Sequence, residues 1–169
     1  MKKVLFALGF MLSATASAQL QARAGFALIE DTSFGINGGV GYDITDKINA
    51  NVDKLTFQTG LDATYYQLKP IENTVSKTTG NGLIFTVPTV AQYEVFEDLN
   101  LGAGLSLNYI TSSIKQDYFG GSYNQSGSVS DFSVGFILEA EYDINQTLSA
   151  RARYNSAAEG VILGIGYKL

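Results

Sequence analysis

Apolar and polar residues alternate along most of this chain with a period of two, which predicts β-strands with two different faces. In the run 101–109, for example, Leu, Ala and Tyr alternate with Gly, Ser and Asn. Because the alternation recurs from end to end, we expect an all-β protein. The predicted strands are 20–28, 34–44, 55–65, 83–93, 101–109, 132–142, 148–154 and 163–169.

One phrase recurs about every fifty residues, at the ends of these runs. Its copies are GVGYDITDKI (39–48), VAQYEVFEDL (90–99) and EAEYDINQTL (139–148), and the chain ends on the shortened copy GIGYKL (164–169). We interpret each copy as a strand that returns to the same rim of a barrel. Short turns at one rim and longer connections at the other are typical of outer-membrane barrels. The short turns are 45–51, 96–98 and 145–147, and the other connections are 31–33, 69–82, 111–131 and 155–160.

Two places depart from the regular pattern. Ile48, Ala50 and Val52 are out of phase with the strand that follows, so either a bulge or a long turn lies near Asp53. Pro88 stands inside a predicted strand, where it removes a hydrogen bond of the ladder. We expect a local bulge at Pro88.

The N-terminus has the features of a secretory signal peptide. Two Lys precede an apolar stretch and a small-residue cleavage site, which predicts a signal at 1–18 and a mature domain at 19–169. Two of the 11 basic residues fall in the signal, so the mature chain has 9 basic and 16 acidic residues. This acidic balance argues against nucleic acid as a partner. Without Cys there are no disulfides, so the fold itself must supply the stability.

Aromatic residues on the apolar face fall at two heights along the strands. Their separation, 8 residues from Phe85 to Tyr93 and 10 from Phe132 to Tyr142, corresponds to roughly 20–25 Å, the height of an outer-membrane apolar band. We therefore expect the apolar face to contact lipid between two aromatic girdles. The periplasmic girdle is Tyr42, Tyr93, Tyr142 and Tyr167, and the outer girdle is Phe34, Tyr65, Phe85, Tyr109, Phe132 and Tyr154.

The opposite face carries charges of both signs, which fits a lumen better than lipid. A cation facing mid-membrane lipid would cost about 2–4 kcal/mol, whereas in a lumen it can pair with a carboxylate. We expect Glu139 and Glu141 to pair with Arg151 and Arg153 on the neighbouring strand. The whole predicted lumen charge network is Arg23, Asp62, Glu139, Glu141, Arg151, Arg153 and Lys168. The alternative with the faces reversed is a soluble, lipocalin-like periplasmic barrel that binds an apolar ligand.

The mature chain resembles small bacterial outer-membrane barrels with eight strands, of the outer membrane protein β-barrel domain family. The resemblance is clearest in TVPTVAQYEVFEDLNLGAGLSLNYI (86–110), with its Pro-containing strand, turn and Gly-rich strand. It implies an antiparallel up-and-down transmembrane β-barrel, inserted by the barrel assembly machinery and monomeric. Members of this type usually end in an aromatic residue, whereas this chain ends in Leu169, so Leu169 or Tyr167 carries the assembly signal.

The chain has no His, which excludes His-dependent nucleophilic sites and His-ligated metals, and we expect no enzyme activity and no cofactor. Eight strands enclose a lumen that side chains largely fill. We expect a plugged barrel that serves envelope integrity or surface contact; a narrow channel for ions or small solutes is the alternative. An extracellular partner could contact the connections 69–82 and 111–131. The second holds Tyr118, Phe119 and Tyr123 and is either an interaction loop or two strands extended beyond the membrane.

Overall fold

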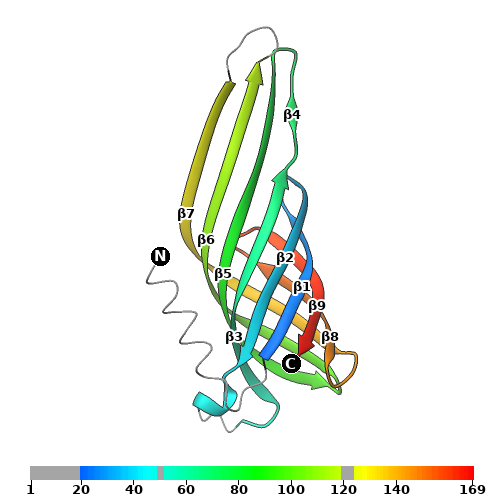
Figure 1. Cartoon of the computed structure of the whole chain (residues 1–169). Coiled ribbons are helices and arrows are strands. Elements are labelled where there is room, and N and C mark those ends of the chain that lie inside the picture. Colours follow the sequence, from blue (N-terminus) through cyan, green and yellow to red (C-terminus); the bar gives the residue numbers. More distant parts are fainter. Residues whose placement is uncertain (1–19, 49–51, 119–123) are drawn as a thin grey trace.

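The chain forms a closed antiparallel β-barrel, seen here in a computed structural model that describes residues 20–48, 52–118 and 124–169 (Figure 1). The predicted signal peptide lies outside the described residues. Within the described ranges, no helix is long and apolar enough to cross a membrane. The elements are β1 (Leu20–Ile29), β2 (Thr32–Asp43), the 3-10 helix η1 (Thr45–Ile48), β3 (Leu55–Leu68), β4 (Ile71–Glu72), β5 (Ser76–Phe96), β6 (Leu99–Tyr118), β7 (Asn124–Asp143), β8 (Leu148–Asn155) and β9 (Gly160–Lys168).

Eight strands make the wall, and each pairs with its neighbour in sequence. The first and last strands, β1 and β9, pair along nine residues, so the barrel has no open seam there. The two-residue strand β4 is the exception, because it pairs only with the far end of β5 and lies outside the wall. The prediction of an eight-stranded up-and-down barrel is therefore confirmed, with β4 as an addition.

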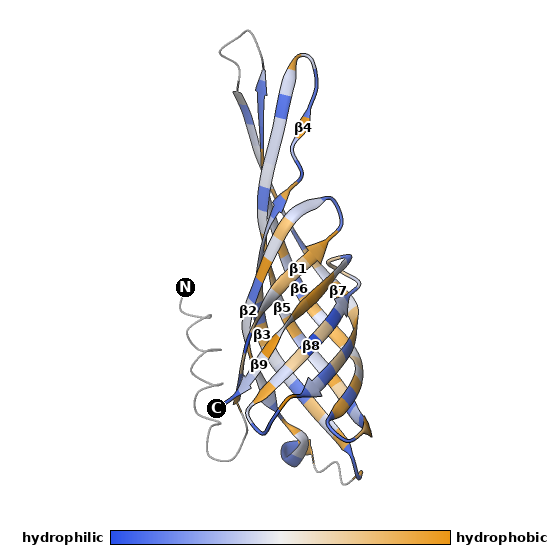
Figure 2. Ribbon diagram, turned by 90° about the vertical axis from the view of Figure 1, so that its right-hand side faces the viewer, coloured by the Kyte–Doolittle hydropathy of each residue, from blue (hydrophilic) through white to orange (hydrophobic). Residues whose placement is uncertain are grey.

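Apolar and polar residues alternate along the strands of the wall (Figure 2). Their exposure shows that the apolar set forms the outer surface and the polar set lines the lumen. On β6, Leu105 is 64% exposed, whereas its neighbour Ser106 is 1% exposed. The same contrast holds on β7, where Val134 is exposed and Glu139 is buried. The barrel thus turns apolar side chains outward and polar ones inward, the reverse of a lipocalin-like barrel.

Three strands extend far beyond the rest of the wall (Figure 1). β5, β6 and β7 are 21, 20 and 20 residues long, and their upper parts form a sheet with β4 that stands above the barrel. We call this part, residues 71–72, 76–81, 112–118 and 124–130, the outer sheet. The prediction that 69–82 is a loop was wrong for most of its length, and of the two alternatives for 111–131 the extended strands are correct. The alternation pattern did not predict these extensions, because the contrast between apolar and polar positions becomes weak in the parts of the strands beyond Tyr109.

Two of the three short turns are stabilised by side chains of the repeated phrase. Asp43 accepts hydrogen bonds from the backbone and hydroxyl of Thr45, at 2.8 and 2.6 Å, and the Thr45 hydroxyl in turn accepts one from the backbone of Phe57. Asn145 plays the same part at the turn 145–147, where it accepts from the backbone of Thr147 and Leu148. A short polar side chain that bonds the backbone two or three residues on is a recognised turn former.

The two irregular places have different outcomes. Near Asp53 the connection is a long turn that includes η1 and a left-handed Lys54 (φ 65°), not a bulge, although 49–51 lie outside the described residues. The predicted bulge at Pro88 was wrong: β5 keeps its register past Pro88 on both sides. In the ladder between β3 and β5, only the pairs of Gly60 and Leu61 are missing. Beside this gap, the Thr59 hydroxyl donates to the Pro88 carbonyl at 2.9 Å.

Candidate functional site in the barrel lumen

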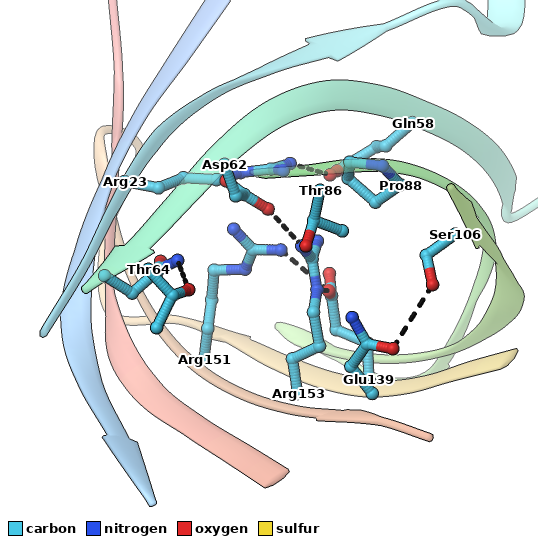
Figure 3. Close-up of polar contacts among 12 residues, drawn as sticks. Arg23, Gln58, Asp62, Thr64, Thr86, Pro88, Ser106, Glu139, Arg151 and Arg153 are labelled. Carbon is cyan, nitrogen blue, oxygen red and sulfur yellow. Dashed lines mark hydrogen bonds and ion pairs between the residues drawn. The ribbon is translucent and has the colours of Figure 1, made fainter. Parts of the chain in front are cut away.

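The centre of the lumen is an ion-pair cluster around Glu139 on β7 (Figure 3). One Glu139 oxygen accepts hydrogen bonds from both Arg151, at 2.7 Å, and Arg153 on β8. Arg153 also reaches across the barrel to Asp62 on β3, at 2.5 Å. All four side chains are at least nine-tenths buried. Because β3 and β8 face each other across the barrel, this cluster closes the lumen with bonds between opposite walls.

A second layer lies towards the rim with the short turns. Glu141 accepts from the Gln21 amide of β1 at 2.5 Å and from the Ser149 hydroxyl at 2.6 Å. Gln92 of β5 donates to Glu139 at 2.7 Å and to Glu141 at 3.2 Å, and so joins the two layers. The alternation of polar residues puts Gln21, Gln92 and Ser149 on the lumen face, but the sequence does not indicate which carboxylate each one meets.

A neutral layer lies on the other side of the ion pairs. Asn108 is fully buried and accepts hydrogen bonds from the Thr86 hydroxyl at 2.9 Å and the Asn155 amide at 2.8 Å. It also donates to the Ser106 hydroxyl at 2.9 Å. The lumen is therefore filled by three stacked layers of bonded polar side chains.

Arg23 of β1 lies beside the ion pairs but forms none with a carboxylate of the described residues. Its guanidinium donates to Gln21 at 2.8 Å and to Gln58 at 2.7 Å. Gly41 makes room for it, because a Cβ at that position would collide with the Arg23 guanidinium. In the same way, a Cβ at Gly39 would collide with the carboxylate of Asp62. These two lumen-facing glycines of β2 thus allow charged side chains to lie flat against the wall.

Lys168 stands apart from the central cluster. It pairs with Asp143 at 2.9 Å near the rim with the short turns, and both side chains are partly exposed. This pair borders a polar vestibule of about 320 Å³. The seven predicted network residues are therefore divided by the structure: five lie in the central ion-pair layers, Arg23 lies beside them and Lys168 is at the rim.

The aromatic positions predicted as girdles all lie on the outer surface. Tyr93, Tyr142 and Tyr167 are about half exposed near the rim with the short turns. The Tyr42 ring lies under the Lys47 ammonium, with Nζ 5.2 Å from the ring centroid. At the other height, the rings of Phe34 and Tyr65 and those of Phe136 and Tyr154 pack in pairs, and Phe85, Tyr109 and Phe132 occupy matching positions on adjacent strands. Of the three loop aromatics, Tyr118 is exposed at the end of β6, and Phe119 and Tyr123 lie outside the described residues.

Comparison with known proteins gives a clear family. The family described as outer membrane protein β-barrel domain matches residues 4–165. Among curated proteins, nothing matches significantly. Solved structures match along most of the chain at low sequence identity, which shows a shared fold.

Three solved structures illustrate that shared fold. A major outer membrane protein of Thermus thermophilus is 10% identical with a TM-score of 0.59, covering 90% of this chain and 100% of that one. Ail, the attachment invasion locus protein of Yersinia pestis, solved with the heparin analogue sucrose octasulfate, is 15% identical with a TM-score of 0.54, covering 90% and 97%. Neisserial surface protein A is 15% identical with a TM-score of 0.51, covering 90% and 96%.

A closed eight-stranded barrel with an apolar exterior and a polar lumen defines an integral outer-membrane protein. The chain belongs to the outer membrane protein β-barrel domain family, and it crosses the bacterial outer membrane as a multi-pass β-barrel.

Proposed function

We propose that this protein is a non-enzymatic surface-contact protein, whose outer sheet binds an extended segment of an extracellular protein by adding it as a strand. The observation that carries the proposal is an unpaired strand edge. β7 pairs with β6 along nearly its whole length, but β8 covers only Ile137–Asp143 on its other side. Above that point, no described strand pairs with the outer edge of β7.

The backbone groups along this edge are available for pairing. Phe136 exchanges hydrogen bonds with Ser156 on the β8 side, through both its N–H and its C=O. Since backbone groups of alternate residues point the same way in an antiparallel ladder, those of Ser126, Ser128 and Ser130 in the outer sheet also point outward. Below them, the N–H of Phe132 already donates to the Asp131 carboxylate at 2.8 Å. An open row of donors and acceptors is the feature that strand addition uses.

The surface of the outer sheet favours a polypeptide over a sulfated glycan. Its described charges are of both signs. Lys77 of β5 pairs with Glu72 at 3.6 Å. On β6, Asp117 stands opposite Lys77, and Lys115 lies two residues before Asp117. A polyanion needs a surplus of cations, which this sheet lacks. Ail was solved with a heparin analogue, but likeness at this level of identity concerns the fold, and we assign no glycan to this chain.

The filled lumen supports surface contact over transport. Bonds from Gln92 and Arg153 to carboxylates on other strands occupy the cross-section, and a solute would have to break them. A planar-bilayer recording of the purified barrel tests this part. We expect no steady conductance; open single channels that change in Glu139→Ala would favour the narrow channel.

Proline substitution tests the edge directly. Proline is tolerated at an edge whose N–H faces solvent, yet it removes the donor that an added strand requires. We expect Ser128→Pro with Ser130→Pro to abolish binding of bacteria expressing the protein to extracellular matrix proteins and cultured cells. The matched control, Ser128→Ala with Ser130→Ala, keeps both N–H groups and should bind like the unchanged protein.

Each variant must first prove to be a folded barrel, shown by a band in the outer-membrane fraction that shifts on heating in SDS gels. Equal binding by the proline and alanine variants would refute strand addition. Loss of binding in both would indicate that side chains of the outer sheet, rather than its backbone edge, make the contact.

A further inference from the structure

A small cavity in the lumen has three arginines among its lining residues. It has a volume of about 20 Å³ and lies against the wall made by β1 and β9, where Gly164 contributes no side chain. Arg23, Arg151 and Arg153 all line it, together with Asn37 of β2. Figure 3 shows the Arg23 and Arg151 side chains entering the lumen from β1 and β8, which are separated in the wall by β9.

Two of these guanidinium groups have nitrogen atoms without a hydrogen-bond partner in the described part of the chain. They are Nη1 of Arg23 and Nε of Arg151, and both atoms are buried. Arg23 is 6% exposed as a residue, and the Arg151 side chain is 8% exposed. The Arg151 Nε is 3.9 Å from the nearest Glu141 oxygen, too far for a hydrogen bond. Buried donors without partners are rare in proteins and usually indicate a bound water or ion.

We propose that this cavity binds a single small anion of the size of chloride. Its volume holds about one water-sized particle, which excludes phosphate, sulfate and carboxylate ligands. Arg151 and Arg153 are paired with the carboxylates of Glu139 and Asp62. The lining still favours a negative particle, because Arg23 has only neutral side-chain partners among the described residues. The ion would accept hydrogen bonds from the two partnerless nitrogens and so join β1 to β8 across β9.

The neutral occupant that competes with the anion is water. Oδ1 of Asp62 is also buried without a partner, and a water could donate to it while accepting from an arginine. A bound anion and a bound water can be distinguished by diffraction. Bromide can replace chloride and scatters anomalously, whereas water has no anomalous signal. The proposal is independent of strand addition, since the cavity lies within the barrel and the edge lies above it.

The first test needs no variant. Crystals of the purified barrel grown in sodium bromide should show an anomalous peak between Arg23 and Arg151. Ordered arginines around a cavity without such a peak would overturn the proposal and assign the cavity to water.

The second test measures stability in two salts. At equal ionic strength, we expect the midpoint of thermal unfolding to be higher in chloride than in gluconate, which is too large for the cavity. Arg23→Gln should remove this difference, and Lys168→Gln, which deletes a rim cation outside the cavity, should keep it. A chloride effect of the same size in Arg23→Gln would refute the site.

Discussion

Glu139 holds the lumen together, so its removal gives the sharpest test of how the barrel is stabilised. Its carboxylate accepts from Arg151, Arg153 and Gln92, which lie on two different strands. The side chain is fully buried. In Glu139→Ala, two buried guanidinium groups lose their shared acceptor, and the shortened side chain leaves a void among them.

The expected loss of stability depends on which hydrogen bonds the former partners of Glu139 retain. Arg153 retains its bond to Asp62, but Arg151 is left with Glu141 at 3.9 Å, beyond hydrogen-bonding distance. Removing one partner of a buried ion pair costs about 3–5 kcal/mol, because the other charge remains buried. We expect Glu139→Ala to lower the free energy of unfolding by about that amount, with Glu139→Gln intermediate because its amide oxygen still accepts a hydrogen bond.

Urea unfolding of the barrel refolded into lipid vesicles measures this loss, with the heat-shifted gel band reporting the folded fraction. The matched control is Asp143→Ala, which breaks the partly exposed pair with Lys168. An exposed pair contributes about 0–1 kcal/mol, so this variant should unfold close to the unchanged protein. If Glu139→Ala and Asp143→Ala lost equal stability, the idea that burial sets the strength of the lumen cluster would be refuted.

Three further substitutions probe the wall, the lipid face and the neutral layer. Gly41→Ala places a methyl group against a guanidinium and should reduce the fraction that assembles into heat-shifted barrel, while Gly38→Ala, where the nearest atom is 3.8 Å away, should assemble normally. Leu105→Arg should lower the free energy of unfolding in vesicles by about 2–4 kcal/mol if it lies near mid-membrane, whereas Ser128→Arg in the outer sheet should not change it. Asn108→Leu removes the acceptor of two buried donors, the Thr86 hydroxyl and the Asn155 amide, and should cost about 1–3 kcal/mol for each, read by the same urea titration.

The sequence was sufficient to predict the wall of the barrel. Period-two alternation gave the strands and their two faces, and the repeated Tyr phrase located the rim with the short turns. The pairing of Glu139 with Arg151 and Arg153 was also accessible, because a short turn sets β7 beside β8 with these residues in adjacent register. Local spacing is enough wherever the partners lie on one hairpin.

Contacts across the lumen were not predictable from that spacing. Gln21 bonds Glu141 from 120 positions away, and Arg153 bonds Asp62 from 91. Which residues meet depends on how far each strand is staggered around the closed barrel, and no single hairpin reveals this. The same limit explains Arg23, which was grouped with the ion pairs by its charge although its partners are Gln21 and Gln58.

At the junction between the barrel and the outer sheet, the same three strands pass from the membrane-spanning wall into the sheet above it. Phe85, Tyr109 and Phe132 stand side by side on β5, β6 and β7, and one step further out on the same face Thr111 faces Ser130. The apolar outer face therefore ends within one step on β6 and β7, and one step later, after Leu83, on β5. Backbone pairing of β6 with β7 continues through this boundary without a register shift. Because no hinge separates the two parts, the outer edge of β7 is ordered by the same ladder that closes the barrel. The edge is therefore already ordered before a partner strand binds. Only the partner would lose conformational entropy on binding, which lowers the entropic cost.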